Sequence, residues 1–141
     1  MLRETVAIPS TFEAYVAEEV GFPARLAVFP TNICNARCTF CQYPLHTDPK
    51  KTITPEIFRA AVDQYVERGG TNLLLNPNNG EPLVDAHFAD NLEYARGKGI
   101  THIEFSTNGI LLKRGDLTDR LVRLADSIGI SLPGFDPENY K

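Results

Sequence analysis

The amino-acid sequence predicts an α/β protein built on a parallel sheet of four strands. Short apolar runs alternate with longer amphipathic stretches in the order strand, helix, strand, helix, strand, helix, strand. Each helical stretch is long enough to carry the chain back across the sheet in a right-handed crossover. In addition, 43% of the 141 residues are hydrophobic and 23% are charged, which is the balance expected of one globular domain.

The chain is expected to begin with a short helix over residues 10–20, because a capping-box pattern opens this stretch and a glycine follows it. Residues 1–25 are therefore assigned to a helical lead-in, and residues 26–141 to the main domain. The first strand is expected over residues 26–29, a brief apolar run that ends at Pro30.

Three amphipathic helices are expected after this strand. The first follows Thr54, an N-cap residue with proline at the next position, and runs to about Arg68. The others cover residues 85–98 and 116–125, and all three carry apolar side chains at spacings of three and four. The three consecutive leucines of the second strand indicate a strand covered on both faces. The remaining strands are expected at Asn72–Leu75, Thr101–Phe105 and Ser127–Leu132.

The composition argues against two classes of partner. The net charge is −4, and the basic residues are scattered rather than gathered into the face that binds nucleic acid. No apolar run is long enough to span a membrane, and the first residues lack the apolar block of a signal peptide. We expect a cytoplasmic protein that binds neither nucleic acid nor a membrane.

All three cysteines lie within eight residues, directly after the first expected strand: Cys34, Cys38 and Cys41. A closed structural zinc site takes four Cys or His ligands, whereas three thiolates leave an open coordination position. A disulfide would use two of the cysteines and leave the third alone. On the residues alone, a zinc site completed by His46 and a set of inert buried thiols stay open as alternatives.

Polar and glycine-rich segments also follow the other three expected strands, at residues 76–82, at residues 106–109 and at Ser131. Ligands of parallel α/β sheets bind at the carboxyl ends of the strands, so all four strand exits are expected to converge on one site. Taken singly, the Asn-Gly segments are also what ordinary tight turns require.

Together these segments resemble the radical S-adenosylmethionine (radical SAM) enzymes. The cysteine motif reads Cys34-x3-Cys38-x2-Cys41, with an aromatic residue just before the last cysteine. The motifs at the other exits are Asn79-Gly80-Glu81-Pro82, Ser106-Thr107-Asn108-Gly109 and Ser131 in Ile-Ser-Leu-Pro-Gly. The resemblance covers the chain from about residue 26 onward. It implies a partial (β/α) barrel with a parallel sheet, of about four of the usual six strand-helix units.

The resemblance implies that the three cysteines ligate a [4Fe-4S] cluster whose open iron binds S-adenosylmethionine (SAM). In the family, the reduced cluster cleaves SAM to a 5′-deoxyadenosyl radical, which abstracts hydrogen from a substrate. No catalytic residue beyond the cluster ligands is implied. The implied partners are a small-molecule or peptide substrate and an electron donor such as a flavodoxin or ferredoxin. The residues implied in cofactor binding are Phe40, Asn79, Gly80, Glu81, Ser106, Asn108 and Ser131.

The chain departs from the family pattern in sequence and in length. Asn79 replaces the first glycine of the family's Gly-Gly-Glu motif, and Pro133 stands where relatives often have aspartate. The chain ends soon after the fourth strand and has no cysteines for further clusters. We therefore expect a part of a longer radical SAM enzyme that turns over little on its own, with an unidentified substrate. The alternatives are an inactive or partner-dependent fragment and a small zinc-binding α/β module.

Overall fold

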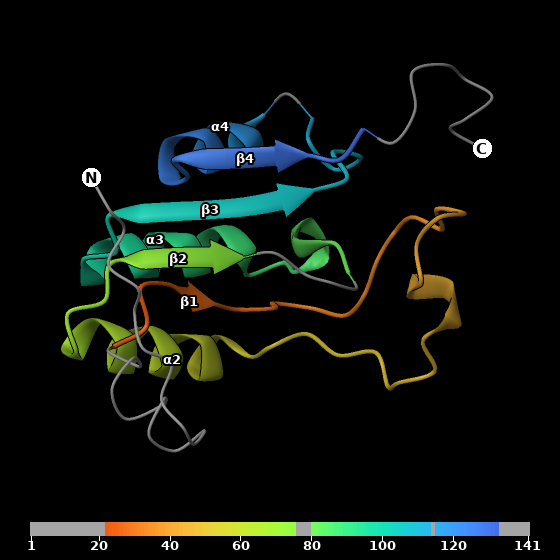
Figure 1. Cartoon of the computed structure of the whole chain (residues 1–141). Coiled ribbons are helices and arrows are strands. Elements are labelled where there is room, and N and C mark those ends of the chain that lie inside the picture. The colour runs from red at the N-terminus through yellow and green to blue at the C-terminus, as the bar shows by residue number, and fades with distance from the viewer. Residues whose placement is uncertain (1–21, 76–79, 114, 133–141) are drawn as a thin grey trace, which may run out of the picture.

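A computed structural model of the chain describes residues 22–75, 80–113 and 115–132. They form one parallel sheet in the strand order β1-β2-β3-β4, with a helix in each crossover (Figure 1). The predicted fold class and the order of the elements from the first strand onward are confirmed, whereas the helix expected at residues 10–20 lies outside the described residues. The strands are β1 (Leu26–Ala27), β2 (Asn72–Leu75), β3 (His102–Thr107) and β4 (Ser127–Ile130). The helices are α2 (Pro55–Glu67), α3 (Phe88–Lys98) and α4 (Asp116–Leu124), with 3₁₀ turns η1 (Tyr43–Leu45) and η2 (Pro82–Val84).

The three α-helices cover the same face of the sheet, and the core lies between them and the strands (Figure 1). Along β3, alternate side chains are buried on the helix side, and the intervening ones remain half-exposed on the other side. No described helix covers that second face, so Leu74 of β2 is only half-buried and the expectation of two covered faces is wrong here. The largest buried core residues are Phe58, Leu73, Leu75, Phe88, Leu92, Ile100, Ile103, Phe105 and Leu121.

Helix boundaries follow the capping residues. Thr54 caps α2 as expected, since its side-chain oxygen accepts from the N–H of Ile57 at 3.4 Å. Helix α3 begins at Phe88 rather than at Asp85, because the Asp85 carboxylate accepts from the N–H of His87 at 2.9 Å and holds a turn there. Within the described part of the chain, no helix has the length and apolar character needed to cross a bilayer.

Strand β1 ends at Ala27, two residues earlier than expected. The N–H of Val28 still donates to β2 at 2.9 Å, but the chain then leaves the sheet. It pairs instead with residues 51–53, where the carbonyl oxygen of Pro30 accepts from the N–H of Ile53 at 2.7 Å. This change of partner directs the cysteine segment beyond the carboxyl edge of the sheet (Figure 1).

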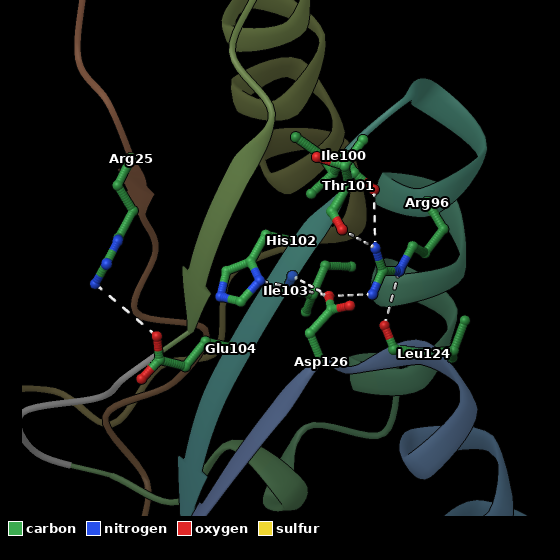
Figure 2. Close-up of polar contacts among 9 residues, drawn as sticks. All are labelled: Arg25, Arg96, Ile100, Thr101, His102, Ile103, Glu104, Leu124 and Asp126. Carbon is green, nitrogen blue, oxygen red and sulfur yellow. Dashed lines mark hydrogen bonds and ion pairs between the residues drawn. The ribbon is translucent and has the colours of Figure 1, made fainter.

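At the opposite edge of the sheet, Arg96 joins the two loops that enter β3 and β4 (Figure 2). Its guanidinium donates to the carbonyl oxygens of Ile100, Thr101 and Leu124 at 3.1, 2.8 and 2.8 Å, and it contacts the Asp126 carboxylate. Asp126 also accepts from a backbone N–H of β3 at 2.8 Å. That backbone hydrogen bond, and next the one from Arg96, lower the pKa of Asp126. This Arg96 cluster ties together the amino-terminal ends of two strands.

We expect Arg96→Ala to lower the free energy of unfolding by about 2 kcal/mol, because three carbonyl groups and one carboxylate lose a charged donor. Urea denaturation followed by circular dichroism measures the change. Arg123→Ala is the matched control, since Arg123 is exposed and its side chain has no hydrogen bond or ion pair with any described residue. It should change the free energy by less than about 0.5 kcal/mol. Equal effects of the two substitutions would contradict the role given to the Arg96 cluster.

Candidate active site at the carboxyl edge of the sheet

The carboxylate of Glu81 joins the exits of β2 and β3. Glu81 is only 2% exposed. Its Oε1 accepts from the hydroxyl of Thr107 at 2.5 Å and from the N–H of Leu83 at 3.2 Å, and its Oε2 accepts from the N–H of Asn108 at 2.7 Å. Three donors offset the cost of burying a negative charge. The buried carboxylate therefore holds the exits of β2 and β3 together.

The side chain of Asn108 connects the exit of β3 to the cysteine segment. Its Nδ2 donates to Oδ1 of Asn35 at 2.8 Å and lies 3.9 Å from Sγ of Cys34. Its Oδ1 accepts from the N–H of Ile110 at 3.0 Å, which fixes the orientation of the amide. The exits of β1, β2 and β3 thus lie together, as the convergence of parallel strands predicts.

The backbone at Gly80 packs directly against the chain that leads to the cysteines. A Cβ atom at this position would lie 2.3 Å from the carbonyl oxygen of Thr31, closer than real Cβ contacts. The N–H of the following residue, Glu81, donates to the carbonyl oxygen of Ile33 at 2.8 Å. Glycine is therefore required here for close approach. Asn79, which is expected beside it in the cofactor site, lies outside the described residues.

The three cysteines are free thiols, and each is half-buried. The N–H of Ala36 donates to Sγ of Cys34 at 3.4 Å, and the N–H of Tyr43 donates to Sγ of Cys41 at 3.3 Å. Such N–H donors help to set the potential of iron–sulfur clusters. Burial raises the pKa of the Cys34 thiol, while the N–H of Ala36 opposes the rise and the charge of Glu81 adds to it.

The described residues do not bring three His, Cys, Asp or Glu side chains to a spacing that could hold a metal ion. The cysteine sulfurs therefore do not converge in this conformation, and no zinc site with His46 is formed either. The number and type of donors, three thiols of which two already receive backbone N–H groups, fit an iron–sulfur cluster. Phe40, expected at the cofactor, is 68% exposed.

Ser106 lies in β3, and Ser131 directly follows the last residue of the neighbouring strand β4. Ser106 is on the uncovered face, opposite Gly129, where a Cβ atom would lie 2.9 Å from the Ser106 hydroxyl oxygen. The N–H of Ser131 donates to the carbonyl oxygen of Thr107 at 2.9 Å, which continues the strand pairing one residue past β4. Neither serine hydroxyl has a hydrogen-bond partner among the described residues, so both are free to bind a ligand.

Thr107 is a site residue that sequence reasoning missed. Its hydroxyl donates to Glu81 and accepts from the N–H of Gly109 at 3.1 Å. The alternation of half-exposed and buried residues along β3 could have indicated this role, because it places Thr107 on the same buried face as Ile103 and Phe105. A buried hydroxyl on an apolar face needs a hydrogen-bond partner, and the nearest strand exit supplies one.

We expect Gly80→Ala to lower the free energy of unfolding by about 2 kcal/mol, because the added methyl group displaces the backbone at Thr31. Gly97→Ala is the matched control, since Gly97 lies in α3 and a Cβ there meets nothing within 4 Å. It should raise the free energy of unfolding by about 0.5–1 kcal/mol through helix propensity. Thermal and urea denaturation measure both. Equal and small effects would show that the close approach at Gly80 is unimportant.

Glu81→Gln is expected to lower the free energy of unfolding by about 2 kcal/mol, because an amide cannot accept from all three donors that surround this position. Glu67→Gln, at an exposed position at the end of α2 with no partner among the described residues, is the control. Urea denaturation measures the difference between the two variants. If Glu81→Gln is as stable as the control, the carboxylate does not brace the strand exits.

A sequence profile of the radical SAM superfamily matches residues 28–141. In structure, the chain is similar to BtrN, whose crystal structure in complex with AdoMet and 2-DOIA gives a TM-score of 0.67. The sequence identity is 14%, and the match covers 76% of this chain and 44% of the BtrN chain. That likeness establishes the shared fold.

Two relatives illustrate the similarity in sequence. A probable GTP 3′,8-cyclase from Methanocaldococcus jannaschii is 28% identical over 118 residues, which cover 82% of this chain and 38% of the relative. The GTP 3′,8-cyclase of Aquifex aeolicus is 30% identical over 122 residues, which cover 80% of this chain and 36% of the relative. The chain thus spans little more than a third of the length of these relatives. Because the superfamily profile covers the described strand exits and the cysteine segment, the chain belongs to the radical SAM superfamily.

Proposed function

We propose that this chain is the cofactor-binding part of a radical SAM enzyme, with its core domain at residues 26–141 and a lead-in at residues 1–25. Membership of the superfamily implies a [4Fe-4S] cluster and SAM as cofactors. When bound, they supply a 5′-deoxyadenosyl radical that abstracts hydrogen from the substrate. The observation that carries the proposal is the linkage of three strand exits, through Glu81 and Asn108, beside Cys34.

In this proposal the cluster is held by Cys34, Cys38 and Cys41. The hydrogen bonds from backbone N–H groups to the first and last of these sulfurs support the assignment, because an anionic cluster is stabilised by such donors. Asn108 anchors the first cysteine to the exit of β3. Cys38 and Cys41 would supply the other two thiolates, so that one iron would keep an open position.

SAM is proposed to lie over the uncovered face of the sheet at its carboxyl edge. The unpartnered hydroxyls of Ser106 and Ser131 are suited to bind its polar groups, and Gly80 is assigned to its methionine end because the family resemblance implies it. Glu81 and Asn108 act as positioning residues, because their side-chain atoms are already bonded within the protein. Contacts from Asn79 and Phe40 stay predictions.

The substrate and the reductant are proposed only by their roles, as a molecule with a hydrogen that can be abstracted and as a one-electron donor. The relatives are named for GTP, but the chain matches 38% or less of their length. Substrate contacts come from several strands of such a barrel. GTP is therefore not proposed as the substrate of this chain. A cytoplasmic location stays a prediction.

Anaerobic reconstitution with iron and sulfide tests the cluster. The wild-type chain should become brown and hold iron equivalent to one cluster, and SAM should change the EPR spectrum of the reduced protein. Cys38→Ala should lose most of the iron because a ligand is removed, whereas Thr39→Ala, its exposed neighbour, should retain it. A colourless chain with one tightly bound zinc would end this proposal.

The same preparation tests turnover. We expect the isolated chain to form little or no 5′-deoxyadenosine from SAM with dithionite as reductant, because the described sheet encloses the site on one side only. Chromatographic measurement of 5′-deoxyadenosine decides this. Sustained formation by the isolated chain would contradict the expectation that it needs further barrel units.

A further inference from the structure

Thr31 lies at the base of residues 31–52, the cysteine segment, which extends beyond the carboxyl edge of the sheet (Figure 1). Thr31 is only 4% exposed, although its side chain is polar. It comes three residues before Cys34 in the sequence. An antiparallel bridge pairs it with Thr52, which follows the last cysteine. Thr31 therefore stands where the cysteine segment leaves the body of the protein and where it returns.

The hydroxyl of Thr31 uses all of its hydrogen-bonding capacity within this base. It donates to the carbonyl oxygen of Lys51 at 3.1 Å. Its oxygen accepts from the N–H of Ile33 at 3.0 Å and from the hydroxyl of Thr52 at 3.0 Å. A hydroxyl has one donor position and two acceptor positions, so all three are filled. One buried group thus joins the beginning of the cysteine segment to its end.

The hydrogen bond to Ile33 acts directly on the backbone before the first cysteine. Ile33 precedes Cys34, and its carbonyl oxygen accepts from the N–H of Glu81 at 2.8 Å. Both backbone polar groups of Ile33 are therefore held, the N–H by Thr31 and the carbonyl by the exit of β2. The backbone from which Cys34 extends is fixed on two sides by contacts within the protein.

Asn32 keeps the two ends of the cysteine segment together by separate contacts. Its N–H donates to the carbonyl oxygen of Lys51 at 3.0 Å, and its Oδ1 accepts from the N–H of Lys51 at 2.7 Å. Its Nδ2 donates to the carbonyl oxygen of Pro49 at 2.9 Å. Loss of the Thr31 hydroxyl should therefore leave the segment closed at its base. The specific loss is the acceptor for the N–H of Ile33.

We propose that Thr31 is a positioning residue for the iron–sulfur cluster, and that its hydroxyl acts through Ile33 on the first cysteine ligand. This inference rests on the proposed function, because it takes Cys34 as a ligand. Three thiolates on one segment lose conformational entropy when they are held by a single group. A backbone that is already fixed before Cys34 reduces this cost, which is the effect of preorganisation.

The test compares Thr31→Val with Thr31→Ser in the full chain. Valine has the shape of threonine without the hydroxyl, whereas serine keeps the hydroxyl without the methyl group. Thr52→Val removes only the bond between the two hydroxyls and leaves Ile33 bonded. Arg96→Ala is the matched control for stability, because the Arg96 cluster lies at the opposite edge of the sheet.

Two measurements are made on each variant. Competition with an iron chelator measures how tightly the anaerobically reconstituted chain holds iron. Mass spectrometry measures how fast iodoacetamide alkylates each cysteine of the iron-free chain. The second measurement needs no cluster, and it distinguishes an effect on one cysteine from a general loss of stability. Circular dichroism reports whether each variant is folded.

We expect Thr31→Val to hold iron on the order of tenfold less tightly than the wild type, as is typical when a group that orients a metal ligand is removed. Alkylation of Cys34 should become severalfold faster relative to Cys38 and Cys41, because the backbone before this half-buried thiol is loosened. Thr31→Ser and Thr52→Val should stay close to the wild type in both measurements. Arg96→Ala should hold iron as the wild type does and change all three alkylation rates by the same factor.

Several results would overturn the role of Thr31. Wild-type iron retention in Thr31→Val, or an equal loss in Arg96→Ala, would remove the link to the cluster. An equal loss in Thr31→Ser would assign the effect to the methyl group, and an equal loss in Thr52→Val would assign it to closure of the segment. A Thr31→Val chain that does not fold would show that the hydroxyl serves the whole fold.

Failure of the proposed function has a different signature. A wild-type chain that takes up no iron contradicts the cluster itself. The alkylation rates of the iron-free chain then still decide whether Thr31 controls the position of Cys34. Unchanged relative rates in Thr31→Val would overturn the positioning role whether or not the wild type binds iron.

Discussion

The buried carboxylate of Glu81 is the interaction on which the carboxyl edge of the sheet depends. A negative charge is stable there only because donors from β3 and from its own turn surround it. To place the charge so deeply, the chain must pass within contact distance of Thr31, which only Gly80 permits. Asn108 then extends the same set of contacts to Cys34. The position of the first cysteine is therefore determined by residues far from it in sequence.

The two faces of the sheet have separate roles. The helix side carries the apolar core, in which the rings of Phe88 and Phe105 pack edge to face with their centroids 5.1 Å apart. The other side presents the half-exposed residues of β3 and the small residues of β4. Stability therefore comes from one face, and the other is free to hold ligands. The segment of residues 31–52, which carries the cysteines, lies beyond the carboxyl edge of the sheet, and its two ends are joined by the bridge between Thr31 and Thr52.

Sequence reasoning predicted those features that depend on local pattern. The order of elements followed from apolar periodicity, and the meeting of the strand exits followed from parallel pairing. It missed features that depend on distant partners. β1 is short because residues 51–53 compete for the chain, and Glu81 serves as a brace because Thr107 lies opposite it. The cysteines are close in sequence, yet among the described residues their sulfurs do not form a metal-binding group, because spacing in sequence does not determine where each side chain of a loop points.

The Arg96 cluster has a consequence for how such a domain can change over generations. It secures the amino-terminal ends of β3 and β4 through backbone carbonyls, which every residue type supplies. Mutations in the loops at the far end of these strands therefore leave this anchorage intact. Homologous domains can therefore diverge in these loop sequences and acquire new reactions while the fold is retained. Because Arg96 and Asp126 hold the amino-terminal ends of the two strands, substitutions in the loops at the carboxyl edge can accumulate without loss of the fold.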